Sequence, residues 1–131
     1  MIRFADKQHE AFYLEQIQRL RDDVYHRALI YTLGISPDTR KHFSGLYDPA
    51  TRTIKRQAIR APWQTGGSLK VTRLAFQLFT DSTPTAYDGD NRDFQECFKY
   101  SVSDIFCTGY APYFVQAIQL RYPEYFQGRV C

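Results

Sequence analysis

The sequence predicts an all-α fold: a mainly helical single domain over residues 1–131, with roughly five to seven helices and an irregular or short extended segment around residues 46–62. Three observations lead to this prediction. Apolar residues recur at helical spacing in several separate stretches, residues that suit helix ends flank these stretches, and no internal repeat or linker divides the chain. With 131 residues, of which 44% are hydrophobic, the chain can bury a core without disulfides or metals.

The chain begins with two predicted helices. The first spans residues 6–21, where apolar residues recur on one face and Asp6 can accept hydrogen bonds from the first turn. The second spans residues 23–33, which are apolar nearly all round from Ala28 onward, and Gly34 is placed to end it. Because a helix with apolar residues on every side is usually buried, we expect the second helix to form the centre of the fold.

A short third helix and the irregular segment follow. Ser36 can cap this helix and Pro37 suits its first position, so we expect it to end near Gly45. Asp48 and Pro49 signal a turn early in the irregular segment, where the apolar residues are isolated. This pattern predicts a turn, a short extended piece and one helical turn.

Helical periodicity returns from Ser68 to about Thr80, with apolar residues on one side. Residues 81–92 are polar and rich in turn residues, which predicts a mobile surface loop. Short helices are then expected within residues 91–99 and around "SVSDIFC". A last helix is expected over "PYFVQAIQLR", because prolines stand at its start and just after its end.

The composition indicates an intracellular protein without a metal or cofactor. Charges begin at Arg3, and no apolar run approaches the roughly 18 residues of a membrane-spanning helix, so we expect a cytoplasmic location and no membrane partner. Three widely spaced cysteines without a CxxC pair indicate reduced thiols, and Cys107 is expected to be buried. His9, His26 and His42 lack the spacing of metal ligands.

The stretch "APWQTGGSLKVTRLAF" contains the first candidate site. In a helix that starts at Ser68, the free backbone N–H groups of the first turn can bind an anion. The two preceding glycines let a ligand approach closely, and nearby basic side chains add positive charge. An ordinary loop-to-helix junction uses the same residues, and the GxxxxGK[ST] spacing of a phosphate-binding loop is missing. The residues of this predicted anion- or partner-binding surface are Trp63, Gln64, Thr65, Gly66, Gly67, Ser68, Lys70 and Arg73, with Arg121 and Tyr122 as neighbours from the last helix.

The uneven distribution of charge indicates an alternative function, nucleic-acid binding. Six basic residues and no acidic ones occur between Pro49 and Thr80, whereas the following stretch is rich in acids. The basic 52–73 segment could therefore contact the phosphates of a nucleic acid. Its "TGGSLKVTRL" is similar to the turn and recognition helix of a helix-turn-helix, but Pro62 and Trp63 interrupt the helix that must precede that turn.

A histidine close to a carboxylate provides a second alternative, a small enzyme. Asp23 lies three residues before His26, so one helical turn can pair the carboxylate with the imidazole and raise its basicity. Such a pair can act as a general base, although a histidine at a helix start more often has a structural role. Asp23 and His26 are the catalytic candidates, and no nucleophile motif such as GxSxG accompanies them.

The blocks "VYHRALIYTLGISPDTR", "WQTGGSLKVTRLAF" and "DIFCTGYAPYFVQAIQLRYPEY" resemble, in the same order, those of a family of small uncharacterised proteins. That family is classed as a domain of unknown function and is encoded by Gram-positive gut bacteria and often by their mobile elements. The resemblance implies no catalytic role. The mobile-element context implies an accessory protein, so the leading hypothesis is a non-enzymatic binding protein: a regulator, adaptor or inhibitor that acts on a protein partner. Homo-oligomerisation through the aromatic residues is compatible with every alternative.

Overall fold

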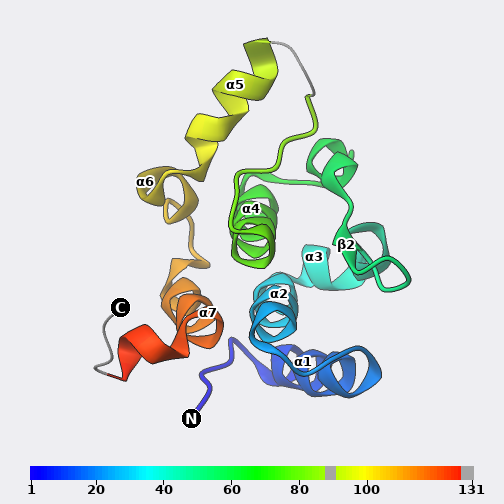
Figure 1. The fold of residues 1–131 in the computed structure, drawn as a ribbon, viewed down its shortest axis with the longest axis vertical. Coiled ribbons are helices and arrows are strands. Elements are labelled where there is room, and N and C mark those ends of the chain that lie inside the picture. The colour runs from blue at the N-terminus through cyan, green and yellow to red at the C-terminus, as the bar shows by residue number, and fades with distance from the viewer. Residues whose placement is uncertain (88–90, 128–131) are drawn as a thin grey trace.

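The computed structural model describes residues 1–87 and 91–127 and is mainly helical, which confirms the predicted fold class (Figure 1). The α-helices in these ranges are α1 (Lys7–Arg19), α2 (Val24–Ile35), α3 (Pro37–Lys41), α4 (Gly66–Thr80), α5 (Asn91–Cys97), α6 (Val102–Ile105) and α7 (Phe114–Arg121). Short 3₁₀ helices cover Phe43–Gly45, Arg56–Arg60, Phe98–Tyr100, Ala111–Tyr113 and Pro123–Phe126. No helix of the described ranges is both long and apolar enough to cross a membrane.

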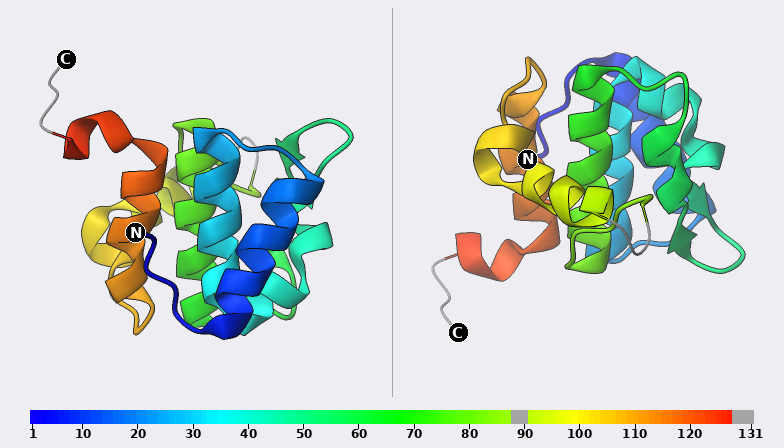
Figure 2. Two further views of the ribbon diagram at one scale, coloured as in Figure 1. Left: turned by 90° about the horizontal axis from the view of Figure 1, so that it is seen from below. Right: turned by 90° about the horizontal axis from the view of Figure 1, so that it is seen from above.

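Helix α2 lies at the centre of the molecule, as its apolar sequence predicted. Every residue from Ala28 to Ile35 is buried, and α1, α4 and α7 pack around it (Figure 2). Burying one large aliphatic or aromatic side chain stabilises a fold by roughly 1.5–3 kcal/mol, so this helix makes a large contribution to the core.

The prediction that Gly34 ends the second helix is wrong. Helix α2 continues through Gly34 to Ile35, and Ser36 follows as its C-cap. A Cβ atom on residue 34 would lie 2.8 Å from His9 Cδ2 and 2.9 Å from Phe12 Cδ2, both on α1. The glycine is therefore explained by the close approach of two helices and not by a helix end.

Most of the predicted helix starts are confirmed by side-chain caps. Asp6 accepts a hydrogen bond from the His9 N–H at 2.7 Å, and Asp23 accepts one from the His26 N–H at 2.8 Å. Ser36 accepts one from the third helix in the same way. These caps satisfy N–H groups of the first turn, which have no partner inside a helix.

The predicted start of the fourth helix at Ser68 is wrong. Helix α4 begins at Gly66, and Thr65 is its N-cap. The Thr65 hydroxyl accepts from the Ser68 N–H at 3.1 Å, and the Ser68 hydroxyl accepts from the Thr65 N–H at 2.7 Å. This reciprocal pair is a capping box, in which the serine occupies the third helical position because the threonine already serves as the cap.

The irregular segment has the predicted mixture of turns and extended backbone. Strands β1 (Tyr47–Asp48) and β2 (Thr53–Ile54) form an antiparallel hairpin, with Tyr47 opposite Ile54. The 3₁₀ turn Arg56–Arg60 follows and buries Ile59 against the core.

Two exposure predictions need correction. The 81–92 stretch is not a purely exposed loop, because Thr85 and Ala86 are buried and the Tyr100 hydroxyl donates to the Pro84 carbonyl. Residues 88–90 of that stretch lie outside the described residues. Cys107 is exposed, although its apolar neighbours in the sequence predicted burial.

Candidate functional site

The predicted binding surface separates into two regions at opposite ends of α4. This helix has 15 residues and is therefore about 22 Å long. Trp63 to Ser68 lie at its N-terminal end, whereas the Arg121 Nε donates to the Leu78 carbonyl at 2.8 Å near its C-terminal end. The structure therefore does not bring Arg121 and Tyr122 next to Trp63.

The side chains at the N-terminal end of α4 contact one another. Trp63 stacks on the His42 ring with a centroid distance of 4.2 Å. The Gln64 amide donates to the Ala58 carbonyl and the Thr72 hydroxyl, each at 3.1 Å, and its oxygen accepts from the buried Ser68 hydroxyl at 2.6 Å. This arrangement anchors the preceding loop to the helix.

Lys70 and Arg73 do not point to the first turn of α4. The Lys70 ammonium donates to the Asp104 carbonyl at 2.5 Å, and the buried Arg73 guanidinium pairs with Glu96 at 3.0 Å. Three other cations of the basic 52–73 segment have internal contacts too: Lys55 donates to the Ser44 carbonyl, Arg56 donates to the Thr85 carbonyl and Arg60 lies over the Tyr87 ring.

A cluster around Arg121 forms the second region. Asp81 ends α4 in a left-handed conformation with φ of 55°, and its carboxylate accepts hydrogen bonds from Arg121 and from the Tyr122 hydroxyl. The guanidinium carbon lies 3.9 Å from the Tyr25 ring centroid and 4.5 Å from that of Tyr122. Burial raises the pKa of Tyr122, and the hydrogen bond to Asp81 adds to this effect. Sequence reasoning selected Arg121 and Tyr122 but missed Tyr25 and Asp81 as their partners.

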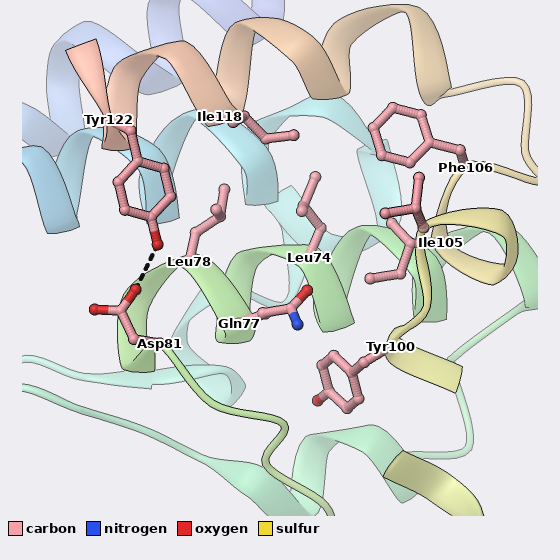
Figure 3. A pocket seen from close by; sticks show the side chains of 10 residues that line it. Leu74, Gln77, Leu78, Asp81, Tyr100, Ile105, Phe106, Ile118 and Tyr122 are labelled. Atoms are coloured by element: carbon pink, nitrogen blue, oxygen red, sulfur yellow. Dashed lines mark hydrogen bonds between the residues drawn. The ribbon is translucent and has the colours of Figure 1, made fainter. Parts of the chain in front are cut away.

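An open groove of 310 Å³ lies beside this cluster, between α4, α6 and α7 (Figure 3). Its walls are mostly apolar, and Gln77, Asp81 and Tyr122 add polar atoms. The apolar lining residues are Leu74, Leu78, Val102, Ile105, Phe106 and Ile118, with Tyr100 at one side. The sequence did not predict this groove because its walls come from segments far apart in the chain.

Three large apolar side chains are exposed on α5, on the 3₁₀ turn that follows it and at the start of α6, and we call them the apolar strip. Phe94 is 70% exposed, Phe98 is 64% exposed and Val102 is 74% exposed. The two phenylalanine rings contact each other edge to face, with centroids 5.3 Å apart. Val102 belongs to both features, because it lines the groove and is exposed.

The predicted pair of His26 and Asp23 does form. The His26 Nδ1 lies 3.0 Å from Asp23 Oδ1, and its Nε2 lies 2.7 Å from the Tyr47 hydroxyl, a partner that sequence reasoning missed. Because the carboxylate can only accept, Nδ1 carries a proton, and a neutral imidazole therefore accepts the Tyr47 O–H at Nε2. Burial acts to raise the pKa of Asp23, but hydrogen bonds from the His26 N–H and imidazole outweigh it and lower that pKa. His26 and Tyr47 line a second cavity, of 170 Å³.

The fold and these sites define a small helical protein with an apolar groove and a separate polar cavity. Among the described residues, no group of three or more histidine, cysteine, aspartate or glutamate side chains could hold a metal ion. The family of unknown function DUF6075 matches residues 1–131, and the chain belongs to this family. Comparison with curated proteins and with solved structures gives no match.

Proposed function

We propose that this protein is a non-enzymatic binding module whose groove and apolar strip receive an amphipathic helix of a protein partner. The observation that supports this proposal most directly is the mostly apolar, open groove, one of whose lining residues, Val102, is also 74% exposed. Contiguous exposed apolar surface is uncommon on proteins that act alone, and it marks interaction sites in many others.

The geometry of the apolar surface suits a helix. A docked helix presents apolar side chains at intervals of three and four residues, and these fill pockets along a groove. The groove volume of 310 Å³ accommodates such side chains, and the exposed Phe94 and Phe98 would offer further apolar contacts to the partner. Burying each of these large side chains would stabilise the complex by roughly 1.5–3 kcal/mol before the costs of association.

The charge near the groove favours a basic partner. Asp81 in the groove wall is already paired with Arg121, whereas Asp104 on α6 is exposed. Opposite charges at the rim of an interface speed association and select the partner, so we expect lysine or arginine on the polar face of the bound helix.

The internal contacts of the basic segment support a protein partner over a nucleic acid. Arg73 is buried in its pair with Glu96, and Lys70 donates to a backbone carbonyl. Phosphate contacts would have to compete with these interactions. The resemblance to known sequences implies an accessory protein of a mobile element. Such proteins act on protein partners as regulators, adaptors or inhibitors.

A displayed library of helical peptides of about 20 residues tests the proposal. We expect selected peptides to have apolar residues at helical spacing and an excess of lysine and arginine. The double substitution Phe98→Ser/Val102→Ser should weaken their binding by about tenfold or more, measured by fluorescence anisotropy. Leu14→Ser on α1 is the matched control, because Leu14 is 57% exposed and lies outside the groove.

Two outcomes would contradict the proposal. The first is an equal effect of the strip variant and the control on peptide binding. The second is binding of labelled DNA or RNA that weakens steeply between about 50 and 200 mM salt and is lost in Lys70→Ala, with no peptide selected, since that result favours the nucleic-acid alternative.

A further inference from the structure

The cavity in front of His26 has the lining of an anion site. Its 170 Å³ are bounded by seven residues, three of them arginines and none of them acidic: Arg19, Leu20, Arg21, His26, Tyr47, Pro49 and Arg52. Arg19 and Arg21 come from the end of α1 and the turn after it, whereas Arg52 comes from the turn between β1 and β2. Positive charges from two separate parts of the chain therefore converge on one small space.

Much of this charge has no carboxylate partner. Arg21 pairs with Asp23 at 2.9 Å, whereas within residues 1–87 and 91–127 Arg19 donates only to the neutral amide oxygen of Gln16, at 2.7 and 3.0 Å. The Arg52 guanidinium has no hydrogen-bond or ion-pair partner in the described part of the chain. Because like charges that face one cavity repel each other, an oxyanion bound between them would lower their electrostatic energy.

The inner wall of the cavity is rigid and polar. His26 and Tyr47 are only 4% and 2% exposed, and hydrogen bonds link them to each other and to Asp23. The Phe79 ring packs edge-on against both of them, with centroids 5.3 Å and 5.7 Å away. Because the protons of His26 Nδ1 and of the Tyr47 hydroxyl are engaged in these hydrogen bonds, the guanidinium groups are the donors that an anion would meet in this cavity.

We propose that this cavity binds the dianionic phosphate group of a small phosphate monoester, with Arg19, Arg21 and Arg52 as its contacts. Guanidinium groups donate pairs of parallel hydrogen bonds to the oxygens of such a group. A cavity of about 150 Å³ holds one benzene molecule. The 170 Å³ here has room for a phosphate and a few further atoms, and too little for a nucleoside as well. This site is separate from the groove, and the proposal is independent of the binding function proposed above.

A titration of the full chain followed by ¹H–¹⁵N NMR tests the proposal. Inorganic phosphate, methyl phosphate and dimethyl phosphate are added separately at constant ionic strength set with chloride. We expect saturable shifts for the two dianions with Kd on the order of 1 mM, at the backbone and guanidinium signals of the lining residues. Dimethyl phosphate has one charge and represents the diester of a nucleic-acid backbone, so its binding should be about fivefold weaker or more.

Two variants make the test specific. Arg52→Gln should weaken phosphate binding by about tenfold or more. Arg3→Gln removes the same charge from an exposed arginine that lies over the Tyr113 ring, outside the cavity, and should change the affinity by less than about twofold. Shifts that fail to saturate, equal effects of the two variants, or a diester that binds as tightly as the monoester would each overturn the proposal.

Discussion

His9 is a buried imidazole with both ring nitrogens occupied. Its Nδ1 accepts from the Ala5 N–H at 3.0 Å, and its Nε2 donates to the Tyr31 carbonyl at 2.7 Å. A second proton on Nδ1 would face another donor. Burial lowers the pKa of His9 below its usual value, and this outweighs the opposing effect of the Tyr31 carbonyl. The folded protein therefore favours the neutral ring.

This lowered pKa predicts a loss of stability in mild acid. The unfolded chain binds a proton at His9 near pH 6.5, whereas the folded chain binds it only at lower pH. The contribution of His9 to the free energy of unfolding is complete above about pH 6.5 and is lost as the pH falls toward the pKa of His9 in the folded protein. We expect the Tm to decrease between pH 7 and pH 5 and the decrease to be smaller in His9→Gln. His42→Gln is the control, and an unchanged pH dependence in His9→Gln would contradict the prediction.

Gly34 provides a second prediction for a single residue. Alanine forms helix better than glycine by about 1 kcal/mol, but its Cβ would meet His9 and Phe12 at less than 3 Å. Because overpacking a core typically costs about 1–3 kcal/mol, we expect Gly34→Ala to lower the free energy of unfolding in urea. Gly45→Ala is the matched control, since a Cβ there has no atom within 4 Å. A Gly34→Ala protein that is more stable than the original would refute the helix contact.

At the scale of elements, α5 is joined to α4 by a buried ion pair. The side chains of Arg73 and Glu96 are only 8% and 13% exposed, and Lys99 also contacts Glu96 at 2.7 Å. The Arg73 Nε has no hydrogen-bond partner among the described residues. Arg73 therefore depends on Glu96 for most of the interaction that offsets the cost of burying its charge. The position of the apolar strip depends on this pair.

Breaking the pair should loosen α5. Glu96→Gln leaves a buried guanidinium without a charged partner, and we expect it to cost about 3 kcal/mol and to raise hydrogen exchange across residues 91–97. The double variant Arg73→Met/Glu96→Gln removes both charges and should recover much of this loss. A double variant as unstable as Glu96→Gln alone would show that the lost stability does not come from the unpaired charge.

At the scale of the whole molecule, Arg121 connects three helices. It donates to the α4 carbonyl of Leu78 and to Asp81 just after α4, and it lies over Tyr25 of α2. The next residue along α2 is His26, which lines the polar cavity. The first turn of α2 therefore takes part in the cluster beside the groove and in the polar cavity.

Arg121→Lys should weaken this connection although it keeps the charge. An ammonium cannot donate in two fixed directions while stacking between two rings, so we expect a loss of about 2 kcal/mol in the free energy of unfolding. Arg60→Lys is the control, because Arg60 is exposed and lies over one ring only. Equal stability of the two variants in urea denaturation would contradict the role assigned to Arg121.

The sequence by itself determined the helical class, the central position of the second helix and most helix starts. Periodicity and caps involve residues within a few positions of each other, so they can be recognised along the chain. The same local signal also paired Asp23 with His26. The prediction for Ser68 failed because Thr65, three residues earlier, forms the same kind of cap.

Only the tertiary structure decided which side chains have hydrogen-bond or ion-pair partners and where cavities form. The sequence around Arg73 predicts an exposed cation, yet Arg73 pairs with a residue of another helix. Tyr47 reaches His26 from 21 positions away, and the groove has walls from three helices. Such contacts depend on how helices pack, and no spacing along the chain encodes them, because packing brings together side chains that are distant in sequence.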